Sequence, residues 1–197
     1  GWSFTTIVAA EPPVIDLSSL SPVKDAIEVP RAPKISLQFD RPIQWGVEGL
    51  FRIREVTSEG IATTVSPGEA GASISSDLLS IKFTSPRLAY GTEYYVEITN
   101  DFVRAVDGAA PFPGLTDKTV WTFTTETAPP FWKEGYPFIG QQDANKLNLN
   151  VLADQTGTVY AVITSNQVAP SAAQIALGKN ALGDNALVSV NGSVEST

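Results

Sequence analysis

The chain has neither cysteine nor histidine among its 197 residues. Without cysteine it cannot form a disulfide, a thiolate zinc site or a cysteine nucleophile. Without histidine it lacks the commonest general base and the commonest transition-metal ligand, and no Ser-His-Asp triad can form. These two absences exclude most of the familiar catalytic and metal centres.

Positive charge is also scarce. The chain carries 13 Lys and Arg against 21 Asp and Glu, a net charge of -8, and its basic residues are scattered singly. Nucleic acids and anionic membranes bind clustered positive charge, so neither is an expected partner. No run of 18 apolar residues predicts a membrane-spanning helix, and no basic and then apolar segment marks a signal peptide. The start at Gly1, without methionine, predicts a mature piece or a fragment of a longer protein.

Apolar residues recur with a period of two along most of the chain, which is the pattern of half-buried strands. The clearest stretches are KISLQF, LFRIRE, LLSIKF, EYYVEIT and VWTFTT. Segments rich in Gly, Pro, Ser and Asp separate them, which predicts an all-β, antiparallel sandwich. The residues expected to point inward are Ile35, Leu37, Phe39, Phe51, Ile53, Leu79, Ile81, Phe83, Tyr94, Val96, Ile98, Trp121 and Phe123. Those expected to point outward include Arg52, Arg54, Tyr95 and Glu97.

One six-residue phrase occurs twice, as GWSFTT at residues 1–6 and as VWTFTT at residues 120–125. Each is followed by a Pro-Pro pair, which favours a stiff, extended linker. A repeat of this length matches one sandwich domain. Residues 1–6 are therefore predicted to be the last strand of a preceding domain, and residues 11–125 a complete sandwich.

Residues 126–197 show a different pattern of predicted elements, with strands and one short helix. KLNLNV is expected to turn at DQTG into TVYAVIT as a hairpin. Ser171 and Gln174 have capping-box spacing, with Gly178 as the helix stop. The tail predicts one more strand, with a possible turn at Asn191-Gly192. So few strands cannot bury both faces of a sheet, so the region is interpreted as the first part of a further β module, or one that pairs with something else.

The order of PPVIDLSSLSP, ISLQFDRPI, LAYGTEYYVEIT, DFVRAVDGAA and WTFTT resembles the bacterial immunoglobulin-like (Ig-like) domains of S-layer and other surface proteins. This resemblance implies an Ig-like β-sandwich over about residues 12–125. GTVYAVI followed by APSAAQIALG resembles the start of a fibronectin-type or Ig-like module. The resemblance to domains of surface proteins also implies an extracellular or cell-surface location.

The sequence LAYGTEY has the form of a tyrosine corner, in the spacing of Leu88, Gly91 and Tyr94, which is a structural feature.

Two other aromatic sites are candidates for binding a ligand. Trp45 follows a proline and precedes a glycine, as an exposed loop aromatic does. Trp132 clusters with Phe131, Tyr136 and Phe138, a group that could stack on sugar rings or fix the angle between two domains.

The acidic residues suggest calcium more readily than catalysis. Glu55 with Glu59, or Asp101 with Asp107, could in principle form an acid pair, but no nucleophile motif or phosphate loop accompanies them, so no enzyme activity is predicted. Calcium needs only oxygen ligands, and candidate donors near the domain junctions are Glu11, Asp16, Asp101 and Asp107. The alternative is that these are solvated turn carboxylates.

The function predicted is that of a structural or adhesive spacer in a large multidomain bacterial cell-surface or secreted protein. Its expected partners are neighbouring domains of the same polypeptide, and like subunits through strand addition or surface-lattice packing. A carbohydrate- or protein-binding module that uses Trp45, Trp132 and Tyr136 is the alternative. A terminal strand with Trp2 and Phe4 would stay free or add to the sheet of a neighbouring molecule.

Overall fold

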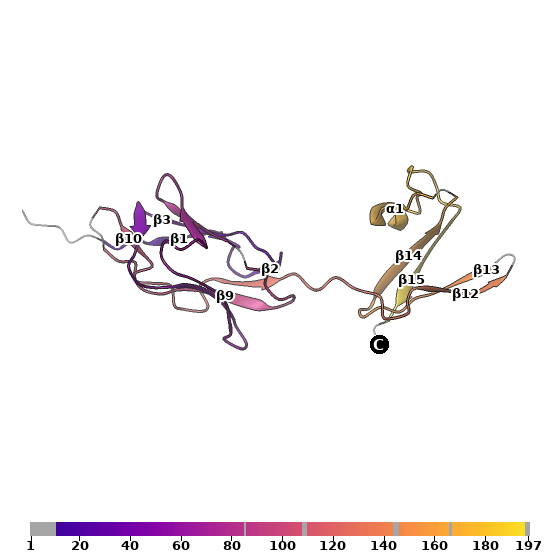
Figure 1. The fold of residues 1–197 in the computed structure, drawn as a ribbon, viewed down its shortest axis with the longest axis horizontal. Coiled ribbons are helices and arrows are strands. Elements are labelled where there is room, and N and C mark those ends of the chain that lie inside the picture. The colour runs from indigo at the N-terminus through magenta and orange to yellow at the C-terminus, as the bar shows by residue number, and fades with distance from the viewer. Residues whose placement is uncertain (1–10, 85, 108–109, 144–145, 166, 196–197) are drawn as a thin grey trace, which may run out of the picture. The chain divides into compact units, whose positions relative to one another are not determined.

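The computed structural model describes residues 11–84, 86–107, 110–143, 146–165 and 167–195 (Figure 1). The strand predicted for residues 1–6 lies outside the described residues. The chain divides into two compact units, unit 1 (residues 1–128) and unit 2 (residues 129–197).

The described part of unit 1 is built from two packed sheets. One has the order β1 (Ile15–Ser21), β3 (Ile35–Phe39), β8 (Ser80–Phe83) and β7 (Ala72–Ile74). The other has the order β2 (Ala26–Val29), β11 (Thr122–Thr125), β9 (Glu93–Ile98), β5 (Phe51–Glu55) and β6 (Ile61–Val65). A short ladder joins β4 (Ile43–Trp45) to β10 (Val103–Ala105). All these pairs are antiparallel except the parallel pair of β11 with β2, which confirms the predicted all-β sandwich.

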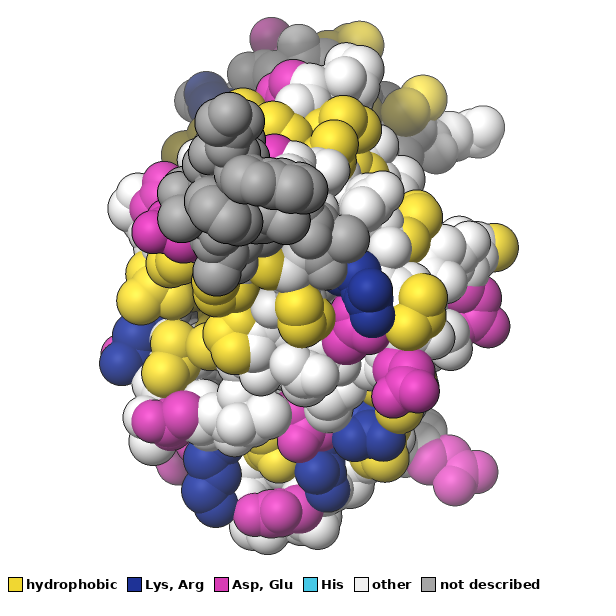
Figure 2. Space-filling view, turned by 90° about the vertical axis from the view of Figure 1, so that its left-hand side faces the viewer, with side chains coloured by type: hydrophobic (Ala, Val, Ile, Leu, Met, Phe, Trp, Pro, Cys, Tyr) yellow, Lys and Arg dark blue, Asp and Glu magenta, His cyan; other side chains and the backbone are white. Residues whose placement is uncertain are grey.

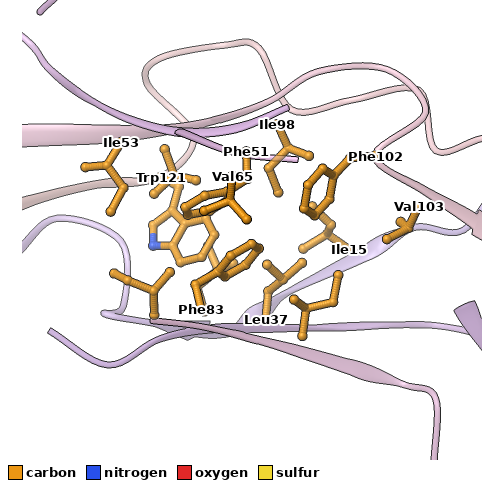
Figure 3. Close-up of a cluster of buried hydrophobic side chains, with 14 of the residues drawn as sticks. Ile15, Leu37, Phe51, Ile53, Val65, Phe83, Ile98, Phe102, Val103 and Trp121 are labelled. Carbon is orange, nitrogen blue, oxygen red and sulfur yellow. The ribbon is translucent and has the colours of Figure 1, made fainter. Parts of the chain in front are cut away.

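The core lies between the two sheets and includes nearly all the residues that the period-two pattern places inward, together with others such as Ile43, Phe102 and Phe112. All the predicted inward residues except Leu79, which stays partly exposed, are at most 7% exposed. Phe51 of one sheet stacks on Phe83 of the other, with their ring centroids 3.6 Å apart. Figure 3 shows these two rings beside Trp121 in the middle of the cluster.

Trp121 and Phe123 confirm the strongest prediction from the sequence. Both are buried, at 0% and 1% exposure, where the chain enters and forms β11. This strand lies between β9 and β2, so it has a pairing partner on each side. The Trp121 indole N–H donates to the carbonyl of Pro22 at 2.8 Å, so the one polar atom of the ring is also satisfied.

Tyr95 contradicts the simple alternation, because it is only 4% exposed although its strand neighbours point inward. The guanidinium of Arg54 lies 6.0 Å from its ring centroid. Arg54 and Arg52 both form ion pairs with Glu97, at 3.6 and 3.1 Å. Long charged side chains thus cover the outer face of the sheet and bury a ring on it.

The predicted tyrosine corner is present. The Tyr94 hydroxyl accepts a hydrogen bond from the backbone N–H of Ala89 at 3.0 Å. Leu88 is 2% exposed, and Gly91 has a φ of 55°, a left-handed value that favours glycine. The corner fixes the loop that leads into β9.

Replacing Tyr94 by Phe should lower the free energy of unfolding of unit 1 by about 1 kcal/mol, because the ring stays in the core while the hydrogen bond to Ala89 is lost. The measurement is urea unfolding followed through the NMR amide signals of unit 1. Tyr160→Phe in unit 2 serves as the control and should leave those signals unchanged. A Tyr94→Phe transition that coincides with the wild-type one would contradict the structural role of the hydroxyl.

The described strands of unit 2 form two separate antiparallel pairs. β12 (Phe138–Asp143) pairs with β13 (Lys146–Asn150), and β14 (Gly157–Ile163) pairs with β15 (Val188–Val194). The predicted hairpin of KLNLNV with TVYAVIT is therefore wrong. The segment after β13 instead meets the chain that enters the unit, where the Phe131 N–H donates to the Asp154 carboxylate at 2.8 Å.

The possible turn at Asn191-Gly192 is also wrong. Both residues lie inside β15, opposite Tyr160 and Val159, in a ladder that runs without a break from Gly157 to Ile163. A turn at these residues would break the ladder and remove backbone hydrogen bonds between β15 and β14.

The predicted helix forms as a single short segment, α1 (Ala172–Ala176). Ser171 and Gln174 make both hydrogen bonds of the capping box. Gly178 follows the last turn with a φ of 69°, which confirms it as the stop.

Unit 2 buries very little. Of its described apolar side chains only Ala153 and Val194 are buried, whereas unit 1 has a continuous core. The two hairpins of unit 2 therefore leave most of their apolar surface open to solvent.

Candidate functional site

Asp101 is the most buried of the candidate carboxylates. It sits at a left-handed backbone position, with a φ of 65°, between β9 and β10. Its two oxygens accept hydrogen bonds from Nε and Nη2 of Arg104, both at 2.6 Å. This bidentate pair lowers the pKa of Asp101 and raises that of Arg104. Both oxygens of Asp101 are thus engaged within its own turn.

The ion pair predicts a pH dependence. Since the folded state lowers the pKa of Asp101, its contribution to stability is present above the ordinary value of 3.8 and is lost as the pH falls through the lower folded value. We expect Asp101→Asn to unfold at lower urea than the wild type at pH 7, and the difference to shrink below about pH 4. Urea unfolding of both proteins across this range measures it. A difference that stays constant with pH would contradict the ionic contribution.

The other calcium candidates, Glu11, Asp16 and Asp107, share no contact with one another. Glu11 forms an ion pair with Arg41 at 3.1 Å. Asp16 accepts hydrogen bonds from the backbone and hydroxyl of Ser18, which lower its pKa. Asp107 is exposed. Among the described residues no group of three or more acidic side chains is placed to hold a metal ion, so calcium binding stays a prediction.

The acid pairs considered for catalysis are likewise engaged locally. Glu55 accepts a hydrogen bond from the Ser58 hydroxyl, and Glu59 forms an exposed ion pair with Lys118 at 3.1 Å. On the face shown in Figure 2, basic and acidic side chains lie in small mixed groups rather than in a single charged patch.

Trp45 lies in a strand rather than in the exposed loop expected from its neighbours. It pairs with Val103 across the ladder of β4 and β10. Its ring is partly buried and meets Phe102 edge to face, with the centroids 5.7 Å apart. Gly68 packs against the same ring, since a Cβ atom added at Gly68 would lie 3.5 Å from the indole. The core therefore holds much of the indole that was expected to be free.

Trp132 lines a pocket of about 360 Å³ within unit 2, together with Phe131, Tyr160 and Ile175. Trp132 is 42% and Tyr160 46% exposed, so both rings remain accessible. Gln155 and Thr158 add polar groups to the lining.

The structure does not bring the three predicted binding residues together. Tyr136 packs on Phe138, at 5.3 Å between centroids, and does not line the pocket, while Trp45 belongs to unit 1. The sequence analysis did not predict Tyr160 and Ile175 as pocket residues. They lie fifteen residues apart, in a strand and in a helix, and no local pattern shows that these two elements meet.

Unit 1 has two distinct ends. The chain enters beside Asp40, whose N–H donates to the Val14 carbonyl at 3.0 Å, while the neighbouring Pro42 carbonyl accepts from Val106. It leaves beside Gly91, whose N–H donates to the Glu126 carbonyl at 2.9 Å. β9 runs from the exit end toward the entry end, and its six residues span about 20 Å. The two chain ends of unit 1 are therefore on opposite sides of the sandwich (Figure 1).

The family model for the bacterial Ig-like domain matches residues 9–125. The chain belongs to this family. The matched bacterial Ig-like domain ends at Thr125, the last residue of β11, so VWTFTT is its closing strand. Such domains occur in surface proteins and are typically non-catalytic. The comparison with curated proteins found no match, and no helix in the described part of the chain is long and apolar enough to cross a membrane.

Proposed function

We propose that the bacterial Ig-like domain is a rigid structural spacer in a larger extracellular protein of the S-layer or adhesin type. The observation that carries this proposal is the position of its two chain ends on opposite sides of the sandwich. A domain with this geometry adds its own length to a tandem array. In this proposal, residues 1–6 close a preceding domain and residues 126–197 begin a further Ig-like or fibronectin-type module.

The continuous core supports rigidity. Aromatic rings from both sheets interlock, and the closing strand is held on both sides, so the two ends of unit 1 cannot move apart without breaking buried contacts. A spacer needs this property more than it needs a binding site.

The test measures the separation of the two ends. Because the chain has no cysteine, Pro12→Cys with Thr127→Cys places spin labels at these two positions alone. We expect a single narrow distance distribution of at least about 20 Å that does not change with salt or calcium. A broad or bimodal distribution would overturn the spacer role. Protease digestion of intact cells that produce the parent protein tests the surface location separately.

Carbohydrate binding in unit 2 is the second candidate, because the Trp132 pocket combines accessible rings with amide and hydroxyl groups. If it operates, Trp132→Ala should abolish binding on a glycan array, since stacking on an aromatic face supplies much of such an interaction. Trp45→Ala is the matched control and should retain it. An array without any wild-type signal would remove this candidate and leave the spacer proposal intact.

A further inference from the structure

Arg31, two residues after β2, contacts the chain that leaves unit 1. Its backbone N–H donates to the Glu126 carboxylate at 3.1 Å. The backbone of Glu126 is held as well, because its N–H donates to the Val29 carbonyl at 2.8 Å and its carbonyl accepts from the Gly91 N–H at 2.9 Å. Glu126 directly follows β11, so the fixed part of unit 1 continues past its last strand.

The side chain of Arg31 holds the corner loop (residues 88–92), which leads into β9. Its Nε donates to the Leu88 carbonyl at 2.5 Å, and the Leu88 N–H donates to the Arg31 carbonyl at 2.8 Å. The guanidinium lies 4.1 Å from the centroid of the Tyr90 ring, which is a cation–π contact. Arg31 and Tyr90 are both partly buried, and a partly desolvated contact of this kind is stronger than an exposed one.

Thr125, the last residue of β11, binds the same loop. Its hydroxyl donates to the Ala89 carbonyl at 2.7 Å and accepts from the Thr92 N–H at 3.0 Å. Thr125 is 1% exposed, so these hydrogen bonds are shielded from water. The corner loop is therefore bound both by Arg31 and by the end of the closing strand.

The contact at the entry end is of a different kind. There the side chain of Arg41 pairs with Glu11, whose side chain is 77% exposed. Exposed ion pairs contribute little, because water and salt screen them. Glu126, by contrast, uses its backbone N–H, its backbone carbonyl and its side chain. The exit end thus has the firmer hold on its chain.

We propose that Arg31, Tyr90 and Glu126 form a clasp that sets the direction in which the chain leaves unit 1. The Pro129-Pro130 pair that follows favours an extended backbone and restricts the residue before it. A stiff linker that starts from a fixed residue points in a fixed direction from unit 1. The inference rests on the proposed spacer role, and it assigns to Arg31 the part of a positioning residue for whatever module follows.

Amide hydrogen exchange of the full chain, followed by NMR, tests the clasp. We expect the Gly91 and Glu126 amides of the wild type to exchange slowly, because both are hydrogen-bonded. Arg31→Ala removes the stacked guanidinium and one hydrogen bond, so both amides should exchange about ten-fold faster or more. The Val96 amide, which donates to the Trp121 carbonyl inside the sandwich, should keep its wild-type rate.

Three further variants sharpen this test. Arg87→Ala makes the same change of charge at an exposed side chain that has no hydrogen bond or ion pair among the described residues, so it should exchange as the wild type does. Glu126→Ala should speed the exchange of the Gly91 amide. Glu126→Gln keeps an oxygen that can accept from the Arg31 N–H, so it should restore the wild-type rate.

The spin-label distance between residues 12 and 127 tests the consequence for the linker. Adding Arg31→Ala to the doubly labelled protein should broaden the distance distribution, because the chain beside the label is released from the corner loop. Adding Arg87→Ala should leave the distribution as narrow as in the wild type.

Two results would overturn the clasp. One is a wild type whose Gly91 and Glu126 amides exchange as fast as those of an unstructured chain. The other is an Arg31→Ala variant in which either these two rates or the distance distribution stays at the wild-type value. Faster exchange at Val96 as well would also count against it, since Arg31 would then stabilise the whole sandwich.

The spacer proposal is decided separately, by the wild-type distance. A narrow wild-type distribution that Arg31→Ala leaves narrow removes the clasp and keeps the spacer. A broad wild-type distribution removes the spacer, and the amide rates still decide whether Arg31 holds Glu126.

Discussion

Replacing Trp121 by Ala should destabilise unit 1 by about 3–5 kcal/mol, a large part of the 5–15 kcal/mol that typically holds a domain together. The indole is fully buried in the middle of the core, and its removal leaves a cavity that the facing rings cannot fill. The Pro22 carbonyl also loses its hydrogen bond. The loss should be visible as a large drop in the urea midpoint of the unit 1 amide signals, measured by NMR.

Two variants frame this expectation. Trp121→Phe keeps an aromatic ring and should fall between the wild type and Trp121→Ala. Trp132→Ala removes a partly exposed indole from unit 2 and should leave the unit 1 transition where it is. If Trp121→Ala unfolded at the wild-type midpoint, the closing strand would not hold the sandwich together, and the interpretation of both copies of the phrase would fail.

Replacing Gly46 by Ala should be as damaging, although it adds a single carbon. That carbon would lie 1.7 Å from the carbonyl oxygen of Asp101, far inside any permitted contact. Neither partner can move away, because the Gly46 N–H is hydrogen-bonded to the Phe102 carbonyl at 3.0 Å and the Asp101 N–H to the Phe112 carbonyl at 2.9 Å. We expect a loss of about 4 kcal/mol or more in the free energy of unfolding.

Gly60→Ala is the matched control. There the nearest atom is the hydroxyl oxygen of Ser58 at 3.0 Å, the end of an exposed side chain that can rotate. This variant should stay within about 0.5 kcal/mol of the wild type. Thermal unfolding by calorimetry and urea titration of both variants separate the two expectations, and a Gly46→Ala protein as stable as Gly60→Ala would show that the turn at Asp101 adapts.

The inward residues and the tyrosine corner of unit 1 follow closely from local sequence patterns. Period-two alternation identified the inward residues of KISLQF and LFRIRE, and the spacing in LAYGTEY identified the corner at Tyr94. Each of these features depends on a few consecutive residues, whose apolar side chains must share one face of a strand. Ser171 and Gln174 were predictable for the same reason, since a capping box is a contact within one helical turn.

The local pattern did not predict which side chains from other parts of the chain cover a residue. Tyr95 is buried because an arginine from the adjacent strand covers it, and Trp45 is held by Phe102, the residue before β10. Asp101 is occupied by Arg104 rather than free for a ligand. The first two contacts join segments far apart in the sequence, whereas Asp101 and Arg104 meet within one turn. In all three, the contact between side chains decides how far a group that looked exposed meets water.

By itself, then, the amino-acid sequence determined that unit 1 is a β-sandwich, which residues of five stretches point inward and where its last strand lies, because the alternation of apolar and polar residues fixes the buried face of a strand. Only the tertiary structure decided which strands pair in unit 2, on which sides of unit 1 the chain enters and leaves, and that Arg31 meets the outgoing chain at Glu126. Strand pairing and such a contact depend on which distant segments meet, and no local spacing encodes that choice.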